Sequence, residues 1–153
     1  MLSIDLPTVS RAMSPHPVCI RQGALLHEAA EIVAFSGVSD LMVVDDLGGF
    51  VGVLSSLHIL RAAMPETDEI LAEGGTLDTA FDLFVSKGRT LAQAPIAPRI
   101  DRDPIMLAPR QHIAEAATIF VDKGLRLLPV VDDGSLVGTV SRADVCRAVV
   151  GIL

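Results

Sequence analysis

The sequence predicts an α/β (α+β) fold in which two β-α-β-β-α repeats pack against each other around a shared core. Residues 17–62 and 104–148 align with a single gap next to Leu47, so they are two copies of one supersecondary unit. In each copy, apolar residues first follow a helical period and then form two short runs that flank a turn. A unit of about 50 residues cannot bury its faces alone, so the two copies are expected to pack together.

Each repeat is expected to begin with a strand and a helix. The strand is a short apolar stretch after a proline, at residues 18–20 and 105–107. The following helix carries apolar residues at i, i+3, i+4 and i+7, which form one buried stripe. The stripe residues are Leu26, Ala29, Ala30 and Val33 in the first copy and Ile113, Ala116, Ala117 and Phe120 in the second. Gly37 and Gly124 stand where a left-handed cap would end each helix.

A hairpin and a second helix complete each repeat. The predicted strands are residues 41–44, 50–54, 128–131 and 136–140. An Asp-Asp pair opens the connecting turn in both copies, at Asp45-Asp46 and at Asp132-Asp133, which is typical of hairpin turns. The closing helices are expected at residues 56–63 and 142–149.

Residues 64–95 differ in composition from the repeats and form a predicted helical connector with six acidic residues. A first helix is expected to be capped by Thr67 and to end at Gly74-Gly75, and a second one, capped by Thr76, to end at Gly88. The apolar face of the second helix is predicted to cover the core or a dimer surface; it consists of Leu77, Ala80, Phe81 and Phe84. The predicted units are residues 8–63 (first repeat), 64–95 (connector) and 96–151 (second repeat).

The composition argues against several function classes. A net charge of -7 and the absence of Trp and Tyr argue against nucleic-acid binding, which needs cationic and aromatic side chains. No apolar run approaches the ~20 residues that span a bilayer, so no membrane insertion is expected. The N-terminus lacks the features of a signal peptide and two cysteines cannot form a disulfide framework, so a cytoplasmic location is expected. Cys19 and Cys146 are predicted to be small core side chains.

The sequence contains no pattern typical of catalysis or metal binding. The four histidines lack metal-ligand spacing, so no metal site is predicted; they are His16, His27, His58 and His112. The paired aspartates belong to hairpin turns, the repeated serines lack a histidine base, and no glycine pair is followed by a P-loop motif. The chain is therefore predicted not to be an enzyme and to require no cofactor.

Several motifs occur in the same order in this sequence and in a known family. They are the start Ala12–Val18, the Glu-Ala-Ala of the first helix in each copy, and the stretches Leu127–Asp132 and Leu136–Asp144. In these features the chain resembles the tandem cystathionine-β-synthase (CBS) domain pair, or Bateman module. The resemblance covers nearly the whole chain except the connector. The resemblance implies repeats packed about a pseudo-two-fold axis, with AMP, ADP, ATP or S-adenosylmethionine bound in the clefts between them. It also implies a homodimer and a stand-alone regulatory module that signals to an unknown partner by conformational change.

The family's ribose-binding motif is a hydrophobic residue followed by x-[Ser/Thr]-x-x-[Asp/Asn]. The second repeat matches it with Thr139, Ser141 and Asp144, whereas His58 replaces the acid in the first repeat. A carboxylate can accept hydrogen bonds from both ribose hydroxyls, whereas a neutral imidazole has one acceptor. The ligand is therefore expected mainly at the second repeat, with Arg142 near a phosphate. Alternatively, Ser141 and Asp144 simply cap the last helix.

The resemblance also implies that the adenine lies against the leading segment and the first hairpin strand of the same repeat. The predicted ligand-binding residues are thus Ile100, Asp101, Pro104, Ile105, Arg126, Leu127, Pro129, Thr139, Ser141, Arg142 and Asp144. A weaker second site would consist of Ser14, Pro17, Val18, Met42, Ser55 and His58. Four arginines are expected near the cleft: Arg99, Arg102, Arg126 and Arg142. An alternative, favoured by His58 and by the acidic Asp101, is a dimerisation or protein-interaction module that has lost ligand binding.

Overall fold

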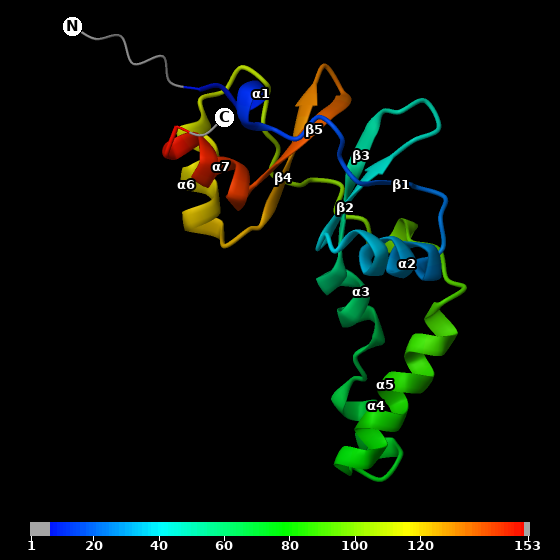
Figure 1. Cartoon of the computed structure of the whole chain (residues 1–153). Coiled ribbons are helices and arrows are strands. Elements are labelled where there is room, and N and C mark those ends of the chain that lie inside the picture. Colours follow the sequence, from blue (N-terminus) through cyan, green and yellow to red (C-terminus); the bar gives the residue numbers. More distant parts are fainter. Residues whose placement is uncertain (1–6, 152–153) are drawn as a thin grey trace, which may run out of the picture.

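A computed structural model gives the arrangement of the chain and describes residues 7–151 (Figure 1). Residues 1–6, part of the N-terminal stretch considered above as a leader, lie outside the described residues. The first lobe contains strands β1 (Cys19–Arg21), β2 (Asp40–Val44) and β3 (Phe50–Ser55) with helices α2 (Leu26–Ser36) and α3 (Ser56–Ala63). The second lobe contains β4 (Leu127–Asp132), β5 (Ser135–Ser141), α6 (Ile113–Lys123) and α7 (Arg142–Val149). The predicted mixed α and β architecture is confirmed.

The two sheets differ in their first strand. In the first lobe, β1 pairs parallel to β2 and β2 pairs antiparallel to β3. In the second lobe, β4 and β5 form an antiparallel hairpin, and the strand predicted at residues 105–107 is reduced to a single parallel bridge from Leu107 to Val130. Only Leu107 is buried in this stretch, since Ile105 and Met106 are turned toward solvent, so the prediction of a full strand there is wrong.

The first helix of each repeat is delimited by its caps. Gly37 and Gly124 end α2 and α6 with φ values of 71° and 65°, which confirms the two predicted left-handed caps. The glutamate of each Glu-Ala-Ala motif accepts a hydrogen bond from the backbone N–H three residues earlier, at 2.7 Å for Glu28 and 3.2 Å for Glu115. This contact satisfies an N–H that has no partner within the helix. Ala30 was predicted to lie in the buried stripe of α2 but is exposed.

The segment that precedes each repeat, its leading segment, packs against the core of the opposite lobe. A short helix that the sequence did not predict, α1 (Val9–Ala12), packs into the core of the second lobe, where the Val9 N–H donates to the Gln111 carbonyl at 2.8 Å. Ile96 and Ile100, on either side of the 3₁₀ helix η1 (Ala97–Arg99), pack into the core of the first lobe. Each core is therefore completed by the leading segment of the other repeat.

The connector is a helical hairpin of α4 (Thr67–Ala72) and α5 (Leu77–Leu91) that projects away from both sheets (Figure 1). Thr76 caps α5 as predicted, because its hydroxyl accepts from the Thr79 N–H at 3.1 Å. Glu66 rather than Thr67 is the cap of α4, so the predicted cap at Thr67 is wrong. Helix α5 continues through Gly88, so the predicted stop there is wrong; a glycine inside a helix costs only about 1 kcal/mol. Among the described residues, no helix is long and apolar enough to cross a membrane.

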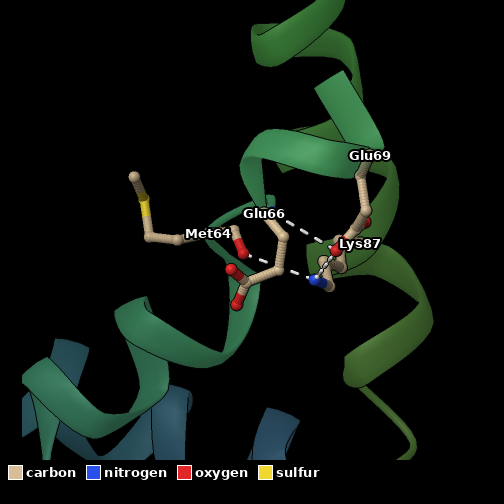
Figure 2. A network of polar contacts seen from close by, with 4 residues as sticks. All are labelled: Met64, Glu66, Glu69 and Lys87. Atoms are coloured by element: carbon tan, nitrogen blue, oxygen red, sulfur yellow. Dashed lines mark hydrogen bonds and ion pairs between the residues drawn. The ribbon is translucent and has the colours of Figure 1, made fainter. Parts of the chain in front are cut away.

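Lys87 of α5 forms polar contacts that link the two connector helices (Figure 2). The Lys87 ammonium donates to a Glu69 carboxylate oxygen at 2.8 Å and to the Met64 carbonyl at 3.3 Å. Glu69 also accepts from the Glu66 N–H at 3.2 Å, and these contacts, led by the Lys87 hydrogen bond, lower the pKa of its carboxyl group. The hairpin therefore has a defined geometry although none of its described side chains is fully buried.

Cys19 and Cys146 are exposed, so the prediction that they are core residues is wrong. Cys19 is the outward-facing first residue of β1, in which only the central Ile20 points into the core. Partial burial nevertheless raises the pKa of the Cys19 thiol. Cys146 lies between the buried positions Val145 and Ala148 of α7, on the flank of the helix that faces solvent.

Candidate functional site

The leading segment of the second repeat crosses the edge of β3 in the first lobe. Val53 and Asp101 exchange two backbone hydrogen bonds, each 2.9 Å long. A side chain at Gly52 would collide with this segment, since its Cβ would overlap the Asp101 carbonyl oxygen and lie 2.8 Å from the Ile100 Cγ2 atom. Glycine is therefore required at position 52 for the two backbones to approach this closely.

This crossing borders a cleft of about 570 Å³, the central cleft, to which both repeats contribute. The first repeat contributes the start of β2, the end of β3 and the first turn of α3, with Ser39, Asp40, Val53, Ser55, Ser56, Leu57, His58 and Leu60. The second repeat contributes its leading segment, with Asp101, Asp103, Pro104 and Ile105, and the approach to β4, with residues 124–129. The volume lies within the range of roughly 300–1,000 Å³ found for small-molecule sites.

A second crossing repeats this arrangement with the lobes exchanged. Ser14, which aligns with Asp101, exchanges two backbone hydrogen bonds with Thr139 of β5, at 2.8 and 3.0 Å. A Cβ on Gly138, the counterpart of Gly52, would lie 2.6 Å from the Ser14 carbonyl oxygen. The leading segments thus cross the hairpins of the opposite lobes in equivalent ways, as a pseudo-two-fold relation requires.

The predicted ligand-binding residues of the second repeat do not all lie together, because they are divided between the two crossings. Asp101, Pro104, Ile105, Arg126, Leu127 and Pro129 do line one cleft, but they face Ser55 and His58 of the first repeat. The motif of Thr139, Ser141 and Asp144 lies at the other crossing, beside Ser14, and Ile100 is buried in the first core. The two parts of the predicted site therefore lie at different crossings, because each leading segment pairs with the opposite lobe.

His58 occupies the aligned acid position in the central cleft. Its backbone N–H donates to the Ser55 hydroxyl at 3.2 Å, and its ring Nδ1 accepts from the Ser55 N–H at 3.3 Å. An imidazole that accepts at Nδ1 carries its proton on Nε2 when it is neutral. His58 can therefore offer one N–H to a ligand hydroxyl, but not the two acceptor oxygens of a carboxylate.

Asp144 is bound within its own helix. One carboxylate oxygen accepts from the Ser141 N–H at 2.8 Å, and the other forms an ion pair with Arg147. The Ser141 hydroxyl in turn accepts from the Asp144 N–H at 3.1 Å, so the two residues cap α7. Asp144 and Thr139 are each only 6% exposed. The second motif is thus closed in this structure.

The charge of the central cleft is mostly negative. Asp40, Asp101 and Asp103 line it, whereas Arg126 is the one basic residue among its lining residues. Of the other arginines expected nearby, Arg99 donates to the Pro95 carbonyl at 3.4 Å and Arg142 donates to the Leu125 carbonyl at 2.7 Å. Arg142 is not among the residues that line the central cleft. Among residues 7–151, no group of three or more His, Cys, Asp or Glu side chains is arranged to hold a metal ion.

Several residues that line the central cleft were not predicted from the sequence. They are Ser39, Asp40, Val53, Ser56, Leu57, Leu60, Asp103, Gly124, Leu125 and Leu128. The aligned glycines at 52 and 138 were a usable signal, because a glycine inside a predicted strand indicates close approach of another backbone.

The chain matches a protein-family model and is similar in sequence to several known proteins. The family model described as the CBS domain matches residues 9–65 and 96–151. The CBS domain-containing protein CBSX1 of Arabidopsis thaliana, described as chloroplastic, is 25% identical over 144 residues, which are 87% of this chain and 59% of that protein. An A-adding tRNA nucleotidyltransferase of Aquifex aeolicus is 26% identical over 90% of this chain and 14% of that protein. The chain thus spans between 14% and 59% of the length of the first curated relatives it matches.

Solved structures share the whole architecture. The crystal structure of CBSX2 in complex with AMP superposes with a TM-score of 0.71 at 26% identity, covering 95% of this chain and 98% of that chain. A CBS domain-containing protein from Bacillus anthracis gives a TM-score of 0.74 over 95% of this chain and 94% of that chain; its 17% identity supports the fold alone.

Proposed function

The chain belongs to the CBS-domain family, with two copies of the domain in tandem, and on this basis we propose that it is a cytoplasmic regulatory module. In this proposal the module binds an adenosine-containing ligand in the central cleft, where AMP, ADP, ATP and S-adenosylmethionine are the candidates. The observation that carries the proposal is that both repeats contribute residues to the central cleft. The AMP complex of CBSX2, which is 26% identical to this chain, supports the ligand class.

The lining residues divide into three roles. Ile105 and Leu127 offer apolar surface for an adenine ring, and His58 offers one hydrogen-bond donor to a ribose hydroxyl. Arg126 is the cation that would pair with a phosphate. Since the three aspartates of the cleft would repel additional phosphates, we expect AMP and S-adenosylmethionine to bind more tightly than ATP.

The motif at Ser141 and Asp144 is proposed as a secondary site. A ribose that reaches this carboxylate must displace Arg147 and enter where Thr139 is buried. Binding there is therefore expected to be weaker than in the central cleft, since it requires rearrangement.

A ligand in the central cleft would contact both lobes and so bias their relative packing. We propose that this shift is transmitted by a homodimer to an unidentified partner protein. The proposal assigns no catalytic reaction to the chain.

The test is a thermal-shift titration of the purified protein with the four candidate ligands. A ligand at 100 times its dissociation constant should stabilise the fold by about 2.7 kcal/mol. Ile105→Glu should abolish that stabilisation, whereas Met106→Glu is the matched control, because the neighbouring Met106 is similarly exposed but does not line the cleft. Equal loss in both variants, or none in either, would contradict the assignment to the cleft.

The alternative is a protein-interaction module without ligand binding. It is favoured by His58, which stands at the acid position of the ribose motif and lacks the two acceptor oxygens of a carboxylate. Under this alternative, none of the four ligands stabilises the wild-type protein. Titration against the wild-type chain therefore separates the two functions.

A further inference from the structure

The connector hairpin, residues 67–91 and here called the arm, presents large apolar side chains that the rest of the described chain leaves uncovered. Leu77, Phe81, Phe84 and Val85 of α5 are between 36% and 69% exposed. None of the described side chains of α4 or α5 is buried. Solvent-exposed apolar surface of this extent, gathered on one element, is typical of an interface.

These four residues share one side of α5. Their spacing of i, i+4, i+7 and i+8 places them along a single stripe, and Gly88, at i+11, continues it with open space where a side chain would stand. The half-buried Leu83 and Lys87 lie on a different side of the helix, where Lys87 contacts Glu69 of α4 (Figure 2). The apolar stripe is therefore additional to the contact that holds the hairpin together.

The arm is positioned so that another molecule can reach it. It extends away from both sheets (Figure 1), and α5 contacts the first lobe through α3. Since Lys87 bridges to both Glu69 and the Met64 carbonyl, the stripe is presented on an ordered hairpin.

The charges beside the stripe indicate what would cover it. Asp78 and Arg89 are eleven residues apart, close to three helical turns, so they border the same edge of the stripe at its opposite ends. Arg89 takes part in none of the ion pairs formed within residues 7–151. If a second α5 packs antiparallel about a two-fold axis, Asp78 of each helix lies beside Arg89 of the other. A parallel arrangement would instead leave Asp78 of one helix and Arg89 of the other about three turns apart.

We propose that the arm is a self-association surface through which two copies of this chain pair their α5 stripes in an antiparallel, two-fold arrangement. The contact is isologous and therefore closes on itself as a dimer. It does not depend on the proposed ligand binding. A 15-residue helix is only about 22 Å long. The interface is thus smaller than the standard size of about 1,600 Å², and the dimer should dissociate on dilution.

Sedimentation equilibrium of the full chain over a range of concentrations tests the proposal. The wild-type protein should show a reversible monomer–dimer equilibrium, and Phe81→Glu should raise its dissociation constant at least 10-fold. Phe35→Glu is the matched control, because Phe35 is a fully exposed phenylalanine on α2, outside the arm. A wild-type chain that stays monomeric, or a dimer that Phe35→Glu disrupts and Phe81→Glu does not, would overturn the proposal.

A charge exchange tests the antiparallel arrangement itself. Asp78→Arg and Arg89→Asp should each weaken the dimer several-fold, since each places like charges side by side. The double variant Asp78→Arg/Arg89→Asp should restore the wild-type dissociation constant, because it exchanges the two charges while keeping them opposite. A double variant as weak as the two single changes combined would refute the pairing. Far-UV circular dichroism of each variant verifies that the helices remain folded.

Discussion

Replacing Gly52 by alanine should destabilise the protein far more than a surface glycine replacement, because the second repeat's leading segment lies directly against this position. The new Cβ would overlap the Asp101 carbonyl oxygen and approach the Ile100 Cγ2 atom to 2.8 Å. Both neighbours are constrained, since Asp101 is hydrogen-bonded to Val53 and Ile100 is packed in the first core. The segment must therefore move away from β3.

The magnitude follows from what this movement disrupts. The crossing contains two backbone hydrogen bonds of 2.9 Å, each worth about 1 kcal/mol net. Forcing an extra carbon into a packed site adds about 1–3 kcal/mol. We therefore expect Gly52→Ala to lower the free energy of unfolding by about 3–5 kcal/mol.

Urea unfolding followed by far-UV circular dichroism measures this change; tryptophan fluorescence is not an option because the chain has no Trp. Gly23→Ala is the matched control, since Gly23 has no atom within 4 Å of an added Cβ and its φ is not in the left-handed region. That variant should remain within about 0.5 kcal/mol of the wild type. If Gly52→Ala were equally mild, the leading segment would not cross β3 as described, and the central cleft would lose its structural basis.

Three further outcomes follow from individual side chains. Asp144→Ala should lower the free energy of unfolding by about 1–3 kcal/mol in a urea titration, because it removes the cap contact with the Ser141 N–H, and it should leave ligand affinity at the central cleft unchanged. His58→Asp should tighten AMP binding about 10-fold by calorimetry if the ligand's ribose lies beside this position, because a carboxylate accepts from both hydroxyls; weaker binding would exclude that pose. The Glu69 carboxyl, whose pKa is lowered chiefly by the Lys87 hydrogen bond, stabilises the arm above its unfolded pKa of about 4.5 and loses this effect as the pH falls through its lower folded pKa. An NMR titration of Glu69 should show the lowered pKa in the wild type and a return toward the ordinary value in Lys87→Met.

Local features of the fold were predictable from the sequence because local interactions determine them. The closing helices, Ser56–Ala63 and Arg142–Val149, match their predicted ranges, and both begin after a serine that caps the first turn. The end of α5 was mispredicted at Gly88, since tertiary contact of Leu91 with the first core outweighs the low helix propensity of glycine. The exchange of leading segments has no local sequence signal other than the glycines that make room for it.

The candidate site was predictable only in part for the same reason. The repeat alignment correctly brought Pro104, Ile105 and Arg126 together, because they come from adjacent parts of one repeat. It could not show that this group faces His58 rather than Asp144, since alignment establishes which positions are equivalent and not which copies are in contact. Long-range backbone pairing determines that choice, and it depends on the packing of the whole chain.

The most direct measurement of the central claim is a crystal structure of the protein grown with saturating AMP. We expect electron density for the nucleotide in the central cleft, between His58 on one side and Ile105 and Arg126 on the other, with the phosphate near Arg126. Density beside Asp144 with an empty central cleft, or no nucleotide density at either crossing, would contradict it.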